Sequence, residues 1–576
     1  MKDLFKNLRK TWYYVKDYKL QMFLYVFLNF LSILINLVIP ILSSRIIIYL
    51  TDNKFYQLIM ISIIIFIVEN LRNIIRYLSR YSSLYIYRES FTKLQFDLGS
   101  SILKLENKTI DENSSGVFIQ RLTNDTSRLS DIFNVLNSYI SNILTDLGIF
   151  ITVFIINKIV FAYLVLVTIL LFLIENTRVK KYNKFDSQYR KENEKVSGFV
   201  GEIVRGSRDI KMLNSEKSFM KELNTKVVNL NQTRYNMQNI DRRYALLKGF
   251  SMDLKELLLI ILLVVLIKND SLNVPDALII HNYSGRLTSI INYVGMLLDK
   301  VKDFNLSSER IFNIMEGKKF KKEKFGKKHL NNIKGNFEFK NVSFGYNDEF
   351  VLDKINFKVK ANETIAFVGK SGVGKTTIFN LLCKMYTINS GKITIDNIDI
   401  NELDKDSIRG NITIINQNPY IFNLSIKDNL RLVKDNLTEE EMIEACKIAC
   451  LDDFVETLPN KYDTIVGEGG VSLSGGQKQR LAIARALIQK TEIILFDEAT
   501  SALDNETQSK IQNAIDNMKN EYTIMIIAHR LSTIINCDRI LFLNNGKIQA
   551  QGTHQELLKT CPEYKKLYNS EILKNE

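Results

Sequence analysis

Long apolar runs fill the first 300 residues of the chain, and only short ones follow. An α-helix needs about 20 residues to cross the hydrocarbon core of a bilayer. The pattern therefore predicts six membrane-spanning helices, although the second, fourth and sixth runs carry charges and are weaker taken alone. The runs cover about residues 20–44, 55–76, 136–156, 159–176, 246–267 and 272–298.

Two long polar segments, 77–135 and 177–245, separate these runs, and the connections at the other ends are short. Both segments contain many lysines and arginines, seven in the first, which has as many acids, and sixteen in the second, which is basic. Both have helical apolar spacing and almost no proline. They read as helices that continue beyond the bilayer, on its cytosolic side, where basic loops are retained. Breaks at 113–116 and 205–208 predict turns with short helices that could meet a second domain; plain helical hairpins are the alternative.

Residues 1–19 precede the first run and carry apolar side chains on one helical face, at Leu4, Phe5, Leu8 and Trp12. The segment also carries six basic residues: Lys2, Lys6, Arg9, Lys10, Lys16 and Lys19. This pattern predicts an amphipathic elbow helix on the inner membrane surface. Packing of the same helix against protein is the alternative. With basic inner segments, both termini are expected in the cytosol, and the protein in the plasma membrane.

Ionisable side chains within the apolar runs need an explanation, because charge is costly at membrane depth. One hypothesis is that they pair between helices and support packing. The other is a water-filled pathway, in which the excess of acids favours a cationic amphiphile such as a peptide. The set comprises Glu69, Asp146, Glu175, Asp253 and Glu256 against Arg72 and Arg286.

A lysine-rich linker, 316–335, leads to a segment of short strands, 336–576, typical of an α/β domain. The net charge of +14 is attributed to cytosolic lysine and arginine, because no basic patch with interleaved aromatic residues indicates nucleic acid. The five cysteines form no C-x-x-C pair and read as reduced thiols. Abundant isoleucine, asparagine and lysine suggest a bacterial coding sequence.

A phosphate-binding loop stands at the centre of the second half. The apolar run 365–368 precedes a G-x-x-x-x-G-K-T sequence, and the helical run 378–383 follows it. In this context backbone N–H groups cradle phosphates, the lysine reaches the β- and γ-phosphates, and the first threonine hydroxyl binds Mg²⁺. The loop comprises Gly369, Lys370, Ser371, Gly372, Val373, Gly374, Lys375, Thr376 and Thr377.

Downstream, Glu492 opens a segment whose apolar run, 493–496, is followed by Asp497 and Glu498. A continuous apolar run is expected of a strand that is covered on both faces. Asp497 at its carboxyl end suits a Mg²⁺ ion held through water, and Glu498 suits a general base for water. Together with the phosphate loop, this pair predicts nucleotide hydrolysis.

Just ahead of these acids, Leu473-Ser474-Gly475-Gly476-Gln477 resembles the signature of the ATP-binding cassette (ABC) transporters. With six N-terminal spans, the chain resembles a half-transporter of the type IV exporter fold: a domain-swapped membrane helix bundle fused to an α/β P-loop domain. The resemblance implies further roles for single residues. Tyr346 would stack on adenine, Gln417 would touch Mg²⁺, Glu468 lies in an exporter-specific loop, Asp504 in the D-loop, and His529 would be the switch histidine.

What the resemblance implies for function is ATP-driven export of an amphiphilic drug, lipid or peptide, with ATP and Mg²⁺ at the site. In that family the signature of one cassette closes the nucleotide held by another, so a dimer is implied, either with a second copy or with a homologous half-transporter. An ATP-gated channel or regulatory protein and a flippase of lipid-linked glycans are the alternatives.

Overall fold

The computed structural model describes residues 2–287, 289–331, 333–347, 349–467, 470–498, 505–519, 521–527 and 534–575. The chain forms two compact units. The membrane unit comprises residues 1–103 and 116–316, and the cassette unit comprises 104–115 and 317–576. A short piece of the first polar segment therefore belongs to the cassette unit, which the linear division of the sequence did not foresee.

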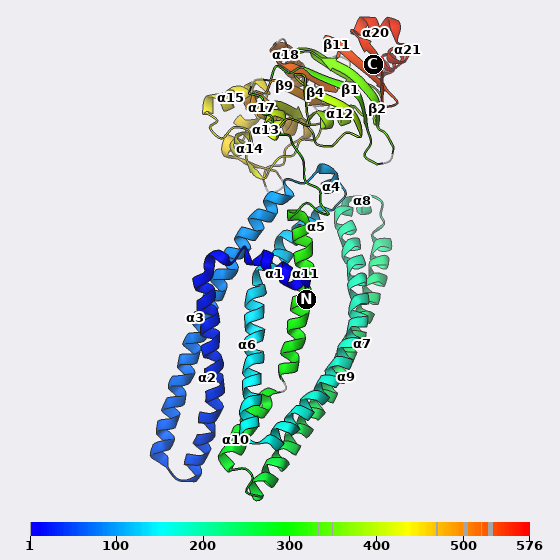
Figure 1. Ribbon diagram of the computed structural model, residues 1–576. Helices are drawn as coiled ribbons and strands as arrows, with labels where there is room; N and C mark the ends of the chain where they lie inside the picture. Colours follow the sequence, from blue (N-terminus) through cyan, green and yellow to red (C-terminus); the bar gives the residue numbers. More distant parts are fainter. Residues whose placement is uncertain are drawn as a thin grey trace. The chain divides into compact units, whose positions relative to one another are not determined.

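The described residues of the membrane unit form helices joined by short turns, such as those at 52–54 and 269–273 (Figure 1). Four helical stretches are long and apolar enough to cross a bilayer: Lys16–Thr51, Phe55–Ile102, Ser115–Ile156 and Lys158–Arg205. The helix that holds the fifth apolar run carries Asp253, Lys255 and Glu256, so six spans stay a prediction. The elements are α1 (Lys2–Trp12), η1 (Lys16–Tyr18), α2 (Lys19–Thr51), α3 (Phe55–Ile102), α5 (Ser115–Gln120), a π-helical turn (Arg121–Asp125), α6 (Thr126–Ile156), α7 (Lys158–Arg205), α8 (Ser207–Met212), α9 (Glu216–Lys268), α10 (Val274–Leu287) and α11 (Ser289–Met315).

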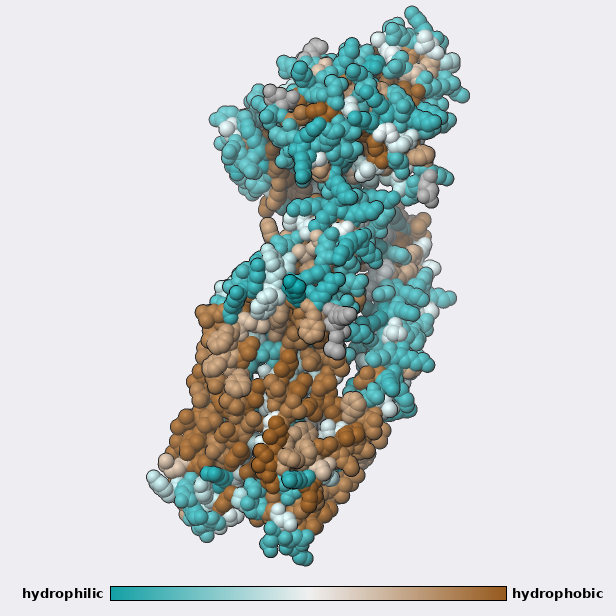
Figure 2. Space-filling view, in the orientation of Figure 1, coloured by the Kyte–Doolittle hydropathy of each residue, from teal (hydrophilic) through white to brown (hydrophobic). Residues whose placement is uncertain are grey.

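Apolar side chains cover the outside of this unit as well as its interior. Figure 2 shows an apolar surface over the helices, bounded by hydrophilic residues at their tips. Inside, a cluster around Ile149, Val160, Leu259 and Ile280 is fully buried and joins α6, α7, α9 and α10. An apolar exterior of this extent suits hydrocarbon as the surrounding solvent.

The amphipathic helix α1 packs on the protein. Asn7 Nδ2 donates to Asn305 Oδ1 of α11 at 3.1 Å, and the Trp12 ring meets the edge of Phe133 of α6 with centroids 5.6 Å apart. Phe5 remains two-thirds exposed. The helix therefore has a protein-facing side, as the alternative expected, and keeps an apolar side chain free for a membrane surface.

The cassette unit contains three sheets, in the strand orders β2-β1-β4-β5, β12-β11-β3-β10-β9-β6 and β7-β8. Every residue of β3, β9 and β10 is buried, because apolar clusters cover both faces of this parallel core. One cluster contains Ala366 and Val368 of β3, and the other contains Ile365 and Phe367 together with residues of β1 and β2. The strands are β1 (Phe337–Phe344), β2 (Leu352–Val359), β3 (Thr364–Val368), β4 (Ser390–Ile395), β5 (Ile398–Asp399), β6 (Ile412–Ile415), β7 (Leu424–Ser425), β8 (Ile465–Val466), β9 (Ile493–Asp497), β10 (Thr523–Ile527), β11 (Arg539–Asn544) and β12 (Lys547–Gly552).

Short helices connect these strands and end the chain. They are α4 (Asn107–Asp111), α12 (Lys375–Leu382), α13 (Lys405–Arg409), α14 (Ile426–Arg431), α15 (Glu439–Ile448), α16 (Asp452–Glu456), η3 (Lys461–Asp463), α17 (Gly475–Gln489), α18 (Asn505–Met518), α20 (His554–Thr560) and α21 (Pro562–Asn575). Of the five cysteines, all but Cys450 are buried, as core thiols should be.

The lysine-rich linker is folded onto the rest of the cassette unit. Its backbone pairs with that of 104–106: Glu106 N donates to Lys321 O at 3.0 Å and Glu323 N to Lys104 O at 2.9 Å. Arg409 of α13 donates to both carboxylate oxygens of Glu323, at 2.6 and 3.0 Å. No sequence pattern indicated this docking. A lysine-rich charge pattern is typical of a solvated segment, and the contacts that hold the linker are made by single acidic and apolar residues.

We predict that Arg409→Lys loosens the linker, because an ammonium cannot reproduce the two-pronged contact with Glu323. The side chains of this pair are only 21% and 11% exposed, so the loss should reach about 1–3 kcal/mol of local stability. Amide hydrogen exchange of residues 320–326 should accelerate accordingly.

The matched control is Lys328→Ala, which removes an ion pair with Glu402 whose side chains are 61% and 50% exposed. A pair this exposed contributes about 0–1 kcal/mol, and exchange should change little. Equal acceleration in both variants would contradict the role given to Arg409.

Candidate functional site

The candidate site lies at one edge of the six-stranded sheet. Strands β3, β10, β9 and β6 are parallel neighbours, with Phe367 and Asp497 both paired to Ile527. Their carboxyl ends therefore meet at the same edge. Ligands bind at this edge in open α/β sheets. The loops after β3, β9 and β6 carry the phosphate loop, Glu498 and Gln417, so the sheet brings these motifs together.

Two glycines of the phosphate loop have no room for a side chain. A Cβ on Gly369 would lie 2.3 Å from the carbonyl oxygen of Leu543. Gly374 has φ +100 and precedes α12 as its N-cap. These positions let the loop wrap closely and direct backbone N–H groups at the helix start, where an anion is favoured.

Lys375 is buried, with 5% exposure, at the first position of α12. Its Nζ donates to the carbonyl oxygens of Gly369 and Lys370, at 2.8 and 2.9 Å. These two hydrogen bonds hold the ammonium group of Lys375 inside the loop. A buried cation needs a compensating anion, and a phosphate in the loop would supply one.

Thr376 and Asp497 form the part of the site that would hold a metal ion. Thr376 Oγ1 donates to Asp497 Oδ1 at 3.1 Å, linking the loop to the end of β9. Among the described residues, no three His, Cys, Asp or Glu side chains cluster as a metal site. A hydroxyl and one carboxylate fit Mg²⁺ instead, which takes few protein ligands and completes its shell with water and phosphate oxygens.

The predicted general base, Glu498, is held next to Gln417. Gln417 Nε2 donates to Glu498 Oε2 at 2.7 Å, and Gln479 Nε2 donates to the Gln417 carbonyl at 3.0 Å. The backbone of Glu498 has φ +50, an uncommon conformation for a side-chain-bearing residue. Such strain is typical of functional positions. It turns the carboxylate away from the strand and toward the edge of the sheet.

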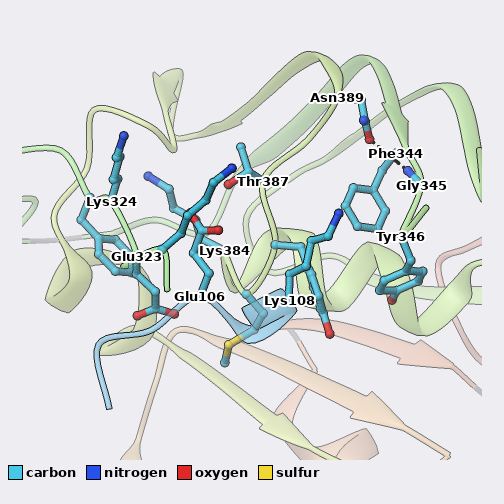
Figure 3. Close-up of a pocket in the computed structure, with 14 residues that line it drawn as sticks. Glu106, Lys108, Glu323, Lys324, Phe344, Gly345, Tyr346, Lys384, Thr387 and Asn389 are labelled. Carbon is cyan, nitrogen blue, oxygen red and sulfur yellow. Dashed lines mark hydrogen bonds between the residues drawn. The ribbon is translucent and has the colours of Figure 1, made fainter. Parts of the chain in front are cut away.

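Tyr346 lines a pocket of about 290 Å³ in the cassette unit (Figure 3). Its hydroxyl lies 3.3 Å from Thr377 Oγ1, and its ring meets the edges of Phe344 and Tyr386, with centroids 5.0 and 5.1 Å apart. The ring is 37% exposed. A partly open aromatic face held on two sides suits the stacking of a base, which is the role expected of Tyr346.

Tyr386 ties this aromatic cluster to α4. Its hydroxyl donates to Asp111 Oδ2 at 2.5 Å. Burial, and then the neighbouring Asp111 carboxylate, raise the pKa of Tyr386 well above its usual value. Sequence reasoning missed both residues, because each is an ordinary residue in its local pattern. The one available hint was that Asp111 lies just ahead of the break at 113–116.

The signature residues lie at the start of α17. Ser474 caps the helix: Gln477 N donates to Ser474 Oγ at 3.2 Å, and Ser474 N donates to Gln477 Oε1 at 2.8 Å. The motif therefore orders its own helix terminus, where Gly475 and Gly476 leave the backbone N–H groups uncovered. Glu468, Asp504 and His529 lie outside the described residues, so their roles stay predictions.

Several acidic side chains of the membrane unit are paired with basic ones, which offsets their negative charge. Glu256 contacts Lys255 Nζ at 2.8 Å and His281 Nδ1 at 3.0 Å. Glu175 accepts from Arg178 at 2.6 Å. The hypothesis of a cationic cargo rested on an acid count that left out these bases, and the pairing removes its support.

We predict that Tyr386→Phe weakens the attachment of α4, because the ring stays while the hydrogen bond to Asp111 is lost. A bond of this kind contributes about 0.5–1.5 kcal/mol, so amide exchange of residues 107–111 should rise about 2- to 10-fold. Asp111→Ala should do the same. Asp111→Asn keeps an accepting oxygen and should stay near wild type; if it behaved like Asp111→Ala, the assigned hydrogen bond would be wrong.

Comparisons with known proteins agree with this geometry. The family model of the ABC transporter transmembrane region matches residues 22–291, and the ABC transporter model matches residues 352–501. The uncharacterized ABC transporter ATP-binding protein YwjA of Bacillus subtilis (strain 168) is 30% identical over 574 residues, covering 98% of this chain and 99% of that protein.

Two further similarities are informative. An ATP-dependent lipid A-core flippase of Desulfotalea psychrophila (strain LSv54 / DSM 12343) is 45% identical over 263 residues, so the match spans about half of each protein, 46% of both. A solved structure of a bacterial Atm1-family ABC exporter with ATP bound shares the fold, with a TM-score of 0.81 at 23% identity, over 96% of this chain and 98% of that one. The chain therefore belongs to the ABC transporters, as a multi-pass membrane protein with an exporter fold and an ATP-hydrolysing cassette.

Proposed function

We propose that this protein is a half-transporter that uses ATP hydrolysis to move an amphiphile out of the cytosol or the inner leaflet. The observation that carries the proposal is the pairing of Gln417 with Glu498 at 2.7 Å, beside an intact phosphate loop, in a chain that also contains a membrane unit. A carboxylate held in this way suits continual turnover. A protein that only sensed nucleotide would not need it.

In the proposed reaction, the phosphates of ATP lie in the loop and Lys375 offsets their charge. Bound Mg²⁺, held through Thr376, Asp497 and Gln417, would neutralise charge on the phosphate oxygens. Glu498 accepts a proton from the attacking water, and Gln417 orients the Glu498 carboxylate through its amide. Tyr346 stacks on the base and sets the distance between the nucleotide and the phosphate loop.

The proposed working form is a dimer of two identical chains. The hydrogen bonds described for Ser474 and Gln477 close within one helix terminus, which leaves its positive end for an anion from outside. We infer that this end covers the nucleotide held by the other cassette. Because the phosphate loop, the signature and Glu498 are all present in one chain, two copies would make two equal sites; a homologous half-transporter is the other possible partner.

The proposed orientation places both termini and the cassettes in the cytosol, at the plasma membrane. The basic polar segments support this orientation. Two observations support an amphiphilic cargo. The apolar exterior of the membrane unit suits a substrate that enters from the lipid, and the chain is similar to a flippase of lipid A-core. Closure of two cassettes over ATP and their separation after hydrolysis would switch the membrane helices between two arrangements.

We predict that Glu498→Gln lowers ATP turnover by about 100-fold or more, since general base catalysis contributes about 10²–10⁴-fold. Affinity for MgATP should persist, because the phosphate loop is untouched. Lys375→Ala should show the opposite pattern, with affinity itself reduced. Phosphate release and equilibrium nucleotide binding, measured on the full chain in lipid nanodiscs, separate the two effects.

The matched control is Glu492→Gln, which changes an exposed acid just before the start of the same strand. Its turnover should equal that of the wild type. Wild-type turnover in Glu498→Gln would reject the proposed base. A protein that hydrolyses ATP yet shows no vectorial movement of any fluorescent lipid in proteoliposomes, but passes ions when ATP binds, would instead be a channel.

A further inference from the structure

A second cavity of the cassette unit, of about 320 Å³, lies between the phosphate loop, β11 and α21. Among the described residues, it shares no lining residue with the pocket beside Tyr346. It therefore lies outside the place expected for the base of the nucleotide. The lining residues that define its chemistry are Lys370, Phe542, Leu543, Glu563, Lys566 and Leu567.

The helix that forms one wall of this cavity is fastened to the strand that forms the other. The Tyr564 ring of α21 meets the edge of Phe542 of β11, with centroids 5.9 Å apart. The Tyr564 hydroxyl also lies 2.9 Å from Nδ1 of the buried His554, at the start of α20. These contacts fix both walls, so the cavity is formed before any ligand arrives, as is usual for small-molecule sites.

One part of the lining is apolar. Phe542 and Leu543 are only 5% and 1% exposed, so these strand residues form the floor of the cavity. Leu567 of α21 is partly buried and adds an aliphatic wall. Small-molecule sites occupy about 300–1,000 Å³ and combine an apolar lining with a few polar groups. The size and the floor of this cavity therefore suit a small ligand with an apolar body.

The charged part of the lining is positive. Lys370 and Lys566 contribute two ammonium groups against the one carboxylate of Glu563, and that carboxylate accepts from Cys561 Sγ at 3.7 Å. For the two ammonium groups, no ion pair or hydrogen bond is found within the described part of the chain. Both lysines are exposed, so they can turn toward a ligand without first breaking a contact. This charge is complementary to a monoanion.

Lys370 connects the cavity to the nucleotide site. Its carbonyl oxygen accepts from Lys375 Nζ at 2.9 Å, and its side chain lines the cavity. The strand β11 backs the same loop, because a Cβ on Gly369 would lie 2.3 Å from the carbonyl oxygen of Leu543. An anion in the cavity would therefore place negative charge next to the phosphate loop, where it opposes the binding of the negatively charged nucleotide.

We propose that this cavity is a second ligand site, which takes a small monoanion with an apolar body, such as an aryl carboxylate, and weakens the binding of MgATP. The carboxylate lies between Lys370 and Lys566, and the apolar body lies over the floor of the cavity. Each ligand lowers the affinity for the other by the same factor, because the linkage between two binding sites is reciprocal. This inference concerns regulation of the cassette and does not depend on what the membrane unit transports.

The first test uses the full chain in lipid nanodiscs without nucleotide, and three probes. 2-Naphthoate carries the proposed charge and an apolar body, 2-naphthylmethylammonium carries the same rings with the opposite charge, and acetate carries the charge alone. Ligand-observed NMR, corrected with empty nanodiscs, should show saturable binding of 2-naphthoate, at least fivefold tighter than that of either other probe. Equal affinity for the ammonium or for acetate, or no binding beyond that of empty nanodiscs, would overturn the proposal.

Variants assign the binding to the cavity. Lys566→Gln should weaken 2-naphthoate binding about threefold, the loss expected for one exposed ionic contact, and Lys566→Arg should keep it. Glu563→Gln should tighten binding, a gain that misfolding cannot produce. The matched control is Lys565→Gln, which changes the neighbouring exposed lysine of α21 outside the lining and should bind as the wild type does. Equal loss in the variants at 565 and 566 would overturn the assignment.

The second test measures the linkage in both directions. Saturating 2-naphthoate should raise the dissociation constant of MgATP about fivefold, at the low end of the usual range of coupling between sites. Saturating MgATP should raise the dissociation constant of 2-naphthoate by the same factor, and Glu563→Gln should leave that factor in place. Binding of 2-naphthoate that leaves the affinity for MgATP unchanged, or increases it, would overturn the proposal.

Discussion

The parallel register of β3, β10, β9 and β6 is the constraint on which the rest of the cassette depends. Parallel strands end at a common edge, so residues from distant parts of the chain meet there without any local preference of their own. Lys375 is buried at the start of α12, and its ammonium group donates to two carbonyl oxygens of its own loop. The hydrogen bond from Thr376 to Asp497 joins the loop to the end of β9.

A second constraint acts in the membrane unit, where charge must be paired or hydrated. Pairing satisfies Glu175 and Glu256. Glu69 and Asp146 likewise lie 3.6 and 3.5 Å from Arg72 and Arg286. The number of charges matters less than which helical faces they share.

The cassette unit also includes two segments that lie outside the nucleotide-binding domain in the linear sequence. The linker and residues 104–106 pair through their backbones, and the Tyr386 hydroxyl binds Asp111 of α4. Tyr386 packs against Tyr346 in turn. A base stacked on Tyr346 would therefore lie two side chains away from a segment of the long polar insertion between α3 and α6.

The sequence by itself determined the class of the protein. Three features can be predicted from local physical chemistry alone: the apolar runs of bilayer length, the glycine loop before Lys375 and the acids after β9. The family resemblance added Tyr346, Gln417 and the signature. Only the tertiary structure decided which single residues meet. Asp111 and Tyr386 have no distinctive neighbours in the sequence, and the docked linker has the composition of a solvated one. Their contacts depend on long-range packing, which no local pattern encodes.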